Sequence, residues 1–402
     1  MPTLTPNLVG MTRAELEDLA LELGQPRYRG RQLYHGLYRR LLPSPDEFTT
    51  LDRTTRRELA GRYEIAYPAV LREIASRDRS VRYLLGLADG ESVEAVYMPW
   101  RAEQRNGRRV ATPSGRELRS RTAGTGLMPD LEHRTADEVE EPRTTLCISS
   151  QVGCAVACAF CFTGLLGARR NLAPGEIVGQ VLTIARERRL WGARDGELGR
   201  RVKPAPRVNI VFMGQGEPML NLRAVMSAVG ILADTGGCAI PLRRITISTA
   251  GIVPRIYDLA REAVRPKLAI SLNASTDEQR DVLMPINRKY PLRALMEACR
   301  AYPLRPRERL TFEYVMLDAV NDADADAARV ARLLTGLPSR VNLIPYNGGA
   351  ALSYRPSPME RVYSFQQTLR ERGVPAFIRI SRGQDIMAAC GQLSLAGQVS
   401  SE

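Results

Sequence analysis

The sequence has little histidine and no long apolar run. Its 402 residues include only His35 and His133, so carboxylates and thiolates are the candidate acids and bases. No apolar stretch approaches the roughly 20 residues that span a membrane. The first residues, MPTLTPNLVG, lack the basic segment and apolar segment of a secretory signal. We therefore expect a cytoplasmic protein without a membrane partner.

The composition allows a large soluble protein with an excess of positive charge. A hydrophobic fraction of 44% and a charged fraction of 25% are ordinary for a globular chain, and the length suffices for two or more units. The net charge is +13, and arginine supplies most of it. This charge favours a polyanion such as RNA as a partner, although a solvated basic surface or a biased genome composition would give the same number.

Three of the seven cysteines lie in one short stretch, QVGCAVACAFCFTG, which places Cys154, Cys158 and Cys161 at C-x3-C-x2-C spacing. Three cysteines cannot pair among themselves without leaving one over. Structural zinc prefers four ligands, and no histidine lies nearby. A [4Fe-4S] cluster fits better, because three thiolates leave one iron open for a further ligand. Zinc and unrelated buried cysteines are the alternatives.

The first 100 residues predict a helical unit followed by a hairpin. Helices are expected after the capping box Thr12–Glu15, over 28–42 and over 52–63. We assign 1–85 to a basic helical module that docks RNA or only extends the packing. A turn at Asp89-Gly90 predicts a hairpin over 81–97, which extends the module at 86–100 and carries Glu94 on its second strand. Residues 101–143 are polar with little periodicity, which predicts a flexible insertion.

From residue 144 to about 385, short apolar runs alternate with helical patterns. Strands are expected at 208–213, 244–248, 267–272, 310–317 and 340–345. Helices are expected at 174–188, 221–235, 254–264, 292–301, 322–334 and 358–372. This alternation predicts an α/β fold with a parallel sheet, closed into a barrel or partial (βα) barrel, whose site lies at the carboxyl ends of the strands. A tail, 386–402, contains Cys390.

The cysteine loop at the start of this core, followed by GEP at 216–218, resembles the radical S-adenosylmethionine (SAM) superfamily. The resemblance narrows to the RlmN/Cfr family of RNA adenine methyltransferases, which has similar motifs in the same order. The segments are TLCISSQVGCAVACAFCFTG, VFMGQGEPMLN, ITISTAGIVP, LAISLNAS, VLMPINRKYPL, VNLIPYN and DIMAACGQL. The N-terminal module, SRGQDI and LIPYN look more like the C2 methyltransferases of the RlmN branch than like the C8 enzymes of the Cfr branch. The resemblance leaves 101–143 unmatched.

The resemblance implies roles for residues that the sequence alone would leave as ordinary thiols and an outward strand residue. Cys390 matches the cysteine that receives a methyl group from a first SAM, and a second SAM is consumed in the same turnover. Cys147 matches the thiol that resolves the protein–RNA adduct through a transient disulfide with Cys390. Glu94 matches the proton acceptor. Cys154, Cys158 and Cys161 match the ligands of the [4Fe-4S] cluster.

The resemblance also implies a SAM site. Its members would be Gly216, Glu217, Ser248, Ser271, Leu272, Asn273 and Asn347. Asn273 stands where the family usually has histidine, so a contact through the backbone would survive and a side-chain role would not.

The implied substrates are 23S rRNA at the peptidyl-transferase centre and tRNA at the adenosine 3′ of the anticodon, with an external electron donor. We expect a monomer. The alternatives are a C8 methyltransferase, a catalytically decayed RNA-binding relative, and a radical SAM enzyme acting on a small molecule.

Overall fold

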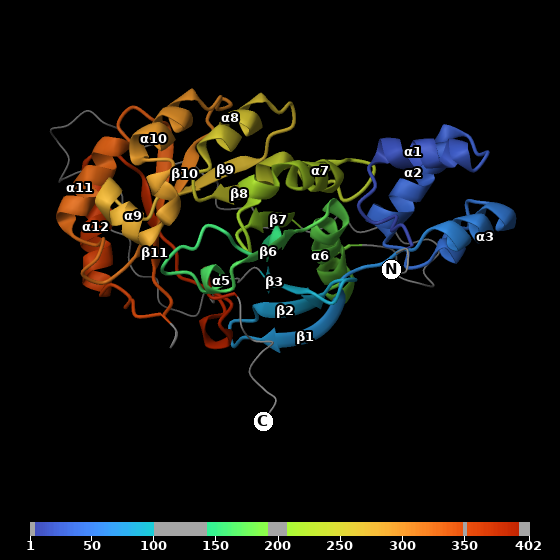
Figure 1. Ribbon diagram of the computed structural model, residues 1–402, viewed down its shortest axis with the longest axis horizontal. Helices are drawn as coiled ribbons and strands as arrows, with labels where there is room; N and C mark the ends of the chain where they lie inside the picture. Colours follow the sequence, from blue (N-terminus) through green and yellow to red (C-terminus); the bar gives the residue numbers. More distant parts are fainter. Residues whose placement is uncertain (1–4, 100–142, 192–206, 349–351, 394–402) are drawn as a thin grey trace, which may run out of the picture.

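The computed structural model describes residues 5–99, 143–191, 207–348 and 352–393 (Figure 1). Within them, three helices form a unit at one end of the molecule, and a ten-stranded sheet with its covering helices forms the rest. No helix in these ranges is both long enough and apolar enough to cross a membrane. The expected insertion at 101–143 lies outside the described residues, except for Arg143, which begins a strand.

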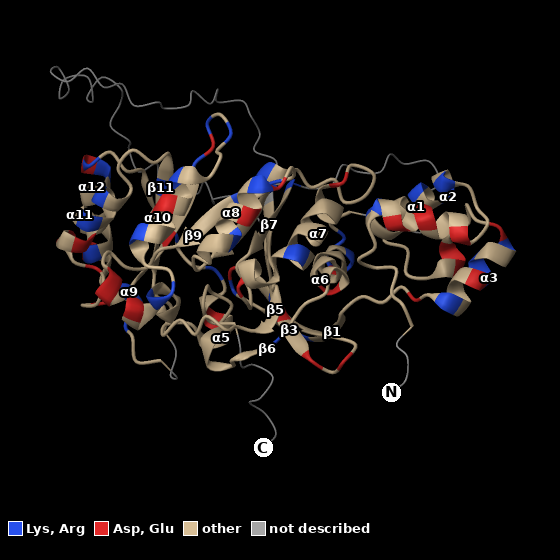
Figure 2. Ribbon diagram, turned by 45° about the horizontal axis from the view of Figure 1, so that its top comes forward, with Lys and Arg blue, Asp and Glu red and all other residues tan. Residues whose placement is uncertain are grey.

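The N-terminal helices form close to where the sequence predicts them. Their bounds are α1 (Arg13–Glu22), α2 (Arg27–His35) and α3 (Arg53–Arg62). Thr12 and Glu15 form the predicted capping box. The second helix ends earlier than expected, because at Gly36–Arg40 the backbone widens into a π-helical turn that closes at the left-handed Leu41. Acidic and basic side chains are mixed along α1 and α3, so the module is less uniformly basic than expected (Figure 2).

The main sheet has the order β1-β2-β3-β4-β7-β8-β9-β10-β11-β12. Its strands are β1 (Ala69–Ala75), β2 (Val81–Gly86), β3 (Ser92–Met98), β4 (Arg143–Cys147), β7 (Arg207–Phe212), β8 (Ile245–Thr249), β9 (Lys267–Ser271), β10 (Leu310–Met316), β11 (Ser339–Pro345) and β12 (Ala376–Ile378). The strands from β4 onward are mutually parallel, whereas β1, β2 and β3 join antiparallel. This is the expected parallel core of a partial barrel, enlarged by an antiparallel edge.

That antiparallel edge corrects one boundary. We assigned residues 1–85 to a helical module that meets the predicted hairpin at residue 81, but the helices end at Arg62 and residues 69–75 form the additional strand β1. The hairpin itself is as predicted, since Gly90 is left-handed in the turn between β2 and β3. Because β1 is largely exposed, it shows little of the apolar alternation that reveals a strand.

Helices cover one face of the sheet. They are α6 (Pro174–Glu187), α7 (Leu222–Ala233), α8 (Val253–Arg261), α9 (Asp277–Leu283), α10 (Leu292–Ala301), α11 (Asp324–Leu333) and α12 (Met359–Glu371). All but α9 were predicted. A separate hairpin of β5 (Gln151–Gly153) and β6 (Ala168–Asn171) encloses the short α5 (Phe162–Leu165). Short 3₁₀ turns occupy Pro45–Glu47, Pro218–Asn221, Leu242–Arg244, Pro285–Arg288 and Gln384–Ile386.

Alternate residues of each strand face opposite sides. On β10, Leu310, Phe312, Tyr314 and Met316 are fully buried in the main apolar core, whereas Glu313 lies on the other face with Ser271 and Asn342 beside it in register. We call this second side the inner face. It carries Glu94, Cys147, Ser248 and Ser271, so the strand pattern gathers the polar candidates on one side of the sheet.

The helical module is joined to the core at a contact without side chains. Gly10, with φ +107°, packs against Gly175 in the first turn of α6. A methyl group on Gly175 would lie 2.2 Å from the carbonyl oxygen of Val9. Nearby, Arg13 forms an ion pair with Asp234, and the Tyr34 hydroxyl donates to the carbonyl oxygen of Ile231 at 3.1 Å.

Replacing Gly175→Ala should therefore push the module away from α6. We expect a loss of about 1–3 kcal/mol of unfolding free energy, the usual cost of overpacking, measured by thermal unfolding followed by circular dichroism. Gly61→Ala is the matched control, because nothing lies within 4 Å of an added methyl there and alanine is favoured within α3 by about 0.5–1 kcal/mol. Equal melting temperatures for the two variants would contradict the proposed contact.

Candidate active site

The three clustered cysteines lie on the loop between β5 and α5. The Cys154 amide donates to the carbonyl oxygen of Gly167 at 2.9 Å, and the Cys161 amide donates to that of Cys158 at 3.1 Å. The Ala159 amide donates to the carbonyl oxygen of Leu283 at 2.9 Å, which joins the loop to the end of α9. Backbone bonds on both sides therefore fix the loop.

The cysteine side chains pack into a small apolar cluster. Its buried members are Val156, Phe160, Ala250, Ala274, Leu283, Met284, Leu317 and Tyr346. This burial raises the pKa of the Cys154 thiol to about 12 and that of Cys158 well above its usual value. Thiolates there need a strong positive charge, which iron supplies. In the described ranges, no three His, Cys, Asp or Glu side chains are close enough together to bind one metal ion. A cluster does not require that arrangement, because each cysteine binds a different iron.

Arg280 of α9 is a fully buried arginine behind this loop, and no sequence pattern pointed to it. It donates to the carbonyl oxygens of Ala250 at 2.6 Å, Ser271 at 3.1 Å and Leu272 at 3.1 Å. These carbonyls follow or end β8 and β9. One guanidinium thus ties the ends of two strands to the helix that holds the cysteine loop. Burial lowers its pKa to about 10.

The C-terminal segment brings Cys390 to the same place. The Phe162 amide donates to the carbonyl oxygen of Gly391 at 2.8 Å, and the Thr163 hydroxyl donates to that of Leu393 at 2.6 Å. The backbone next to Cys390 is thus hydrogen-bonded to the residues that follow Cys161. Its side chain is exposed to solvent, yet surrounding protein raises the pKa of its thiol to about 11, with the Glu313 carboxylate adding to the effect.

Cys147 lies beside this segment. It ends β4, pairs with Val96 on β3, and packs with Ala388 and Leu393 in a second small apolar cluster. Burial and the neighbouring Cys390 both raise the pKa of the Cys147 thiol. Two cysteines far apart in sequence, neither with the spacing of cluster ligands, are therefore brought near each other, because residues on both sides of Cys390 pack against Cys147 on the inner face.

Glu94 is buried on β3 near these cysteines, with 2% of its side chain exposed. One oxygen, Oε1, accepts from Arg82 Nε at 2.9 Å and from Nη2 at 2.5 Å. The other, Oε2, accepts no hydrogen bond from the described residues. Burial raises the pKa of Glu94, and Arg82 opposes that rise. Arg82 thus fixes the Glu94 carboxylate and leaves one of its oxygens free. Glu94 is not the outward-facing strand residue that the sequence alone would indicate.

The GEP segment packs against Gln151 of β5, just before the cysteine loop. Gly216 has φ +92°, and a methyl group there would lie 2.5 Å from Cβ of Gln151, so only glycine fits. Glu217 is buried and accepts the amides of Met219 at 3.0 Å and Ala250 at 2.7 Å. Burial raises its pKa. A carboxylate has about four lone-pair sites, so Glu217 can still accept from a further donor.

The remaining candidates differ in what their side chains do. Ser248 and Ser271 are partly buried on the inner face, and Leu272 is fully buried. Asn273 adopts φ +55°; its Oδ1 accepts the Val315 amide at 2.9 Å, and its Nδ2 lies 3.3 Å from the Met284 sulfur. Asn347 donates to the Ser381 hydroxyl at 2.6 Å and accepts from Gln384 at 2.8 Å. The side chains of Asn273 and Asn347 are therefore engaged in holding loops.

Comparison with known proteins identifies the family. The model of the radical SAM superfamily matches residues 148–331, and that of the ribosomal RNA large subunit methyltransferase N-terminal domain matches residues 6–65. A probable dual-specificity RNA methyltransferase RlmN from Koribacter versatilis is 48% identical, with 92% of this chain and 96% of the relative covered. The chain belongs to the RlmN family of the radical SAM superfamily.

Other members and a solved structure agree. The RlmN of Anaeromyxobacter sp. strain Fw109-5 is 43% identical over 98% of this chain and 92% of the relative. The crystal structure of a radical SAM methyltransferase from Sphaerobacter thermophilus is 42% identical, with a TM-score of 0.78 over 96% of this chain and 99% of that one. The expected fold is confirmed. Membership of the superfamily implies a [4Fe-4S] cluster and SAM, and the buried thiols of the cysteine loop fit the cluster.

If these thiols bind a cluster, replacing any of Cys154, Cys158 or Cys161 by alanine should remove most of the iron and the visible absorption after anaerobic reconstitution. Cys238→Ala is the matched control, because Cys238 is buried in the main core beside the N-terminal module, where its sulfur lies 3.6 Å from the carbonyl oxygen of Tyr38. Metal analysis distinguishes the alternatives. Stoichiometric zinc in place of iron in the unmodified protein would contradict the cluster.

Proposed function

We propose that this chain methylates C2 of adenosine in RNA by way of a methyl group carried on Cys390. The supporting observation is the convergence of the Cys390 segment, Cys147 and the cysteine loop at one place, held by the Phe162–Gly391 and Thr163–Leu393 hydrogen bonds. An RNA methyltransferase that alkylated a nucleophilic base atom would need no such pair of thiols.

The target carbon explains the need for a carrier. C2 of adenine has a hydrogen and no lone pair, so it cannot attack the sulfonium methyl of SAM. In the proposed first step the Cys390 thiolate attacks that methyl instead: a carbon–sulfur bond forms to Cys390, and the sulfonium bond breaks. Gly216, Glu217, Ser248, Ser271, Leu272, Asn273 and Asn347 are the proposed SAM contacts, with Asn273 contributing through its backbone.

With a second SAM bound, a reduced cluster held by Cys154, Cys158 and Cys161 would supply the radical chemistry that converts SAM into a 5′-deoxyadenosyl radical, and the Cys390 methyl group would give up a hydrogen atom to it. The carbon radical held on Cys390 adds to C2. Glu94 then accepts the C2 proton at its free oxygen, and the oxidised cluster would take back one electron. The Cys147 thiolate attacks Cys390, the Cys390–carbon bond breaks, the methyl carbon regains a proton, and a disulfide forms. One electron enters and one leaves, and an external reductant restores the two thiols.

The proposed substrates are 23S rRNA at the peptidyl-transferase centre and tRNA at the adenosine 3′ of the anticodon. The relatives are named dual-specificity RNA methyltransferases, which supports more than one RNA. The target base has to leave its stack to reach the inner face. We propose a monomer that needs an external electron donor. A C8 methyltransferase is the second candidate, because the same thiol arrangement would serve carbon C8.

The test is nucleoside mass spectrometry of 23S rRNA and tRNA after incubation with reconstituted protein, SAM and a low-potential reductant. We expect 2-methyladenosine, none with Cys390→Ala, and at least about 100-fold less with Glu94→Gln, the scale of a lost general base. 8-Methyladenosine would move the protein to the second candidate. An active Cys390→Ala protein would refute the carrier.

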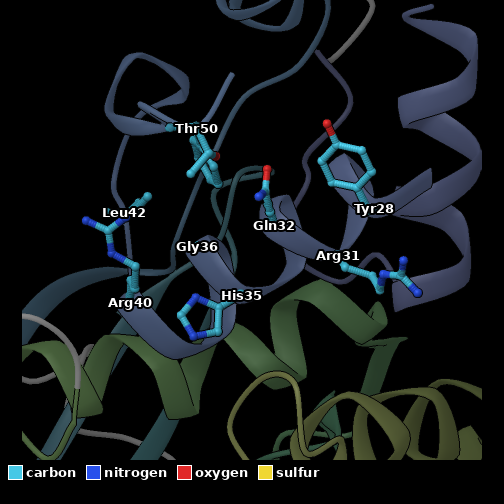
Figure 3. A pocket seen from close by; sticks show the side chains of 9 residues that line it. Tyr28, Arg31, Gln32, His35, Gly36, Arg40, Leu42 and Thr50 are labelled. Carbon is cyan, nitrogen blue, oxygen red and sulfur yellow. The ribbon is translucent and has the colours of Figure 1, made fainter. Parts of the chain in front are cut away.

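The N-terminal module is the proposed RNA-docking unit. A cavity of about 340 Å³ lies between α2 and the loop before α3, and Figure 3 shows His35 beside Arg40 on one side of it. The segment 27–40 contains five arginines and no acidic residue. Of these, Arg31, Arg39 and Arg40 form no ion pair with any described residue. Because burial, Arg40 and Arg39 lower the pKa of His35, the positive charge there comes from arginine, which suits phosphate.

The double variant Arg31→Gln, Arg40→Gln should weaken RNA binding about tenfold and lower the slope of log K against log salt by about one for each phosphate that is no longer neutralised. Arg53→Gln, Arg57→Gln is the control, because it removes the same charge from α3 away from the cavity. Filter binding at several salt concentrations measures both. Equal effects in the two proteins would show that only net charge matters.

A further inference from the structure

Arg82 is a buried arginine that nothing in the sequence singled out. It lies on β2, on the inner face, with 5% of its side chain exposed. Beyond its two bonds to Glu94, Nη1 donates to the carbonyl oxygens of Ile386 at 2.9 Å and Met387 at 3.1 Å. A single guanidinium therefore joins the strand that carries Glu94 to the segment that carries Cys390.

The bonds to Glu94 are one-sided. An arginine paired with a carboxylate commonly donates one hydrogen bond to each oxygen. Here Nε and Nη2 both donate to Oε1, and the buried Oε2 is left without a donor among the described residues. An orphaned buried oxygen costs free energy, so its retention points to a function. The arrangement holds the carboxylate in place and leaves a lone pair for a proton.

The second pair of bonds acts on a strained segment. Met387 adopts φ +50°, a region that a methionine rarely enters, and Arg82 donates to its carbonyl oxygen. The turn between β1 and β2 holds the same segment: the Ser76 hydroxyl donates to Asp385 at 2.6 Å, and the Gly383 amide donates to Asp78 at 3.2 Å. The antiparallel edge of the sheet thus supports the Cys390 segment, and Arg82 is its buried contact.

We infer that Arg82 is a positioning residue that fixes the proton acceptor Glu94 and the Cys390 segment relative to each other, so that proton removal occurs beside the carried methyl group. The inference rests on the proposed function and adds the residue that couples its two parts. Arg82 acts through these two neighbours and is expected to contact neither SAM nor the base.

The charge of Arg82 also affects the pH range in which Glu94 is ionised and can accept a proton. Burial raises the pKa of Glu94 and Arg82 lowers it. The neighbouring groups are the Cys147 thiol on the adjacent strand, whose pKa is raised by burial, and the neutral Gln215 and Ser149 at the Glu94 backbone. Asp78 and Asp385 are engaged with the segment and the β1–β2 turn. Without Arg82 the pKa of Glu94 rises further, so Glu94 is ionised only at higher pH.

The test compares Arg82→Gln with Arg82→Lys, each purified with SAM so that Cys390 carries its methyl group before RNA is added. Peptide mass spectrometry measures Cys390 methylation, and nucleoside mass spectrometry measures 2-methyladenosine across pH. For Arg82→Gln we expect Cys390 methylation within about twofold of the unmodified protein, product formation at neutral pH at least about tenfold lower, and partial recovery as pH rises. Arg82→Lys keeps the charge and should restore a profile close to the unmodified one.

Arg188→Gln is the matched control. Arg188, at the end of α6, binds Glu73 on β1 and Tyr83 on β2 from the helix-covered face. Its loss therefore tests general damage to these two strands. Its pH profile should be unchanged. An unaltered profile in Arg82→Gln, or identical losses in Arg82→Gln and Arg82→Lys at every pH, would overturn the inference. Failure of the unmodified protein to methylate Cys390 would instead refute the proposed function, and the inference with it.

Discussion

Along each parallel strand, successive residues alternate between the two faces of the sheet, and the site depends on this alternation. Each of the main-sheet strands β4 and β7 to β12 presents one set of residues to the covering helices and the other to the inner face. The helix-facing set is apolar and closely packed, which fixes strand register, because a shift of one residue would exchange the faces. The inner set is thereby free to be polar. Ser271, Glu313 and Asn342 lie side by side in the sheet for this reason, and their positions follow from packing on the opposite face.

Burial of charge is the second feature that unites the site. Arg280 donates to carbonyl oxygens and an amide oxygen, Glu217 accepts backbone amides, and Glu94 uses one oxygen. Such groups are costly in an apolar interior unless their hydrogen bonds are met. Arg280 meets its hydrogen bonds mainly with backbone carbonyl oxygens at strand ends, and each Glu217 oxygen accepts one backbone amide, so both side chains are fixed while Glu217 keeps capacity for a further donor. Only one of the two Glu94 oxygens accepts hydrogen bonds from the described residues. The free oxygen makes Glu94 suited to accept a proton.

The sequence predicted the parts of the fold that have strong local periodicity. Most helices and the strands β7 to β11 were placed within a few residues, because their apolar patterns are regular. The strand β1 was missed because it is an exposed edge, and β5 and β12 because each spans only three residues; β4 and β6 were not predicted either. The Arg82–Glu94 contact was predictable in principle: a turn at Asp89-Gly90 fixes the hairpin register, and that register makes the two residues diagonal neighbours. The approach of Cys390 to Cys147 was not, since no local pattern links a tail to a distant strand, and only the family resemblance pointed to it.

The Cys390 segment explains why so short a tail can take part in chemistry at the centre of the molecule. Its apolar contacts lie in one small cluster, where Ala388 and Leu393 pack with Cys147, and hydrogen bonds position the rest of the segment. Gly383, Met387 and Gly391 all adopt left-handed conformations, which reverse the chain repeatedly within a few residues. These reversals aim successive carbonyl oxygens in different directions: that of Met387 toward Arg82, and that of Gly391 toward the amide of Phe162. The segment is therefore held from the β1–β2 edge on one side and from the cysteine loop on the other, and Cys390 lies between these two attachments. An antiparallel addition to a parallel core thus serves a definite purpose, because without β1 and β2 one of the two attachments would be missing.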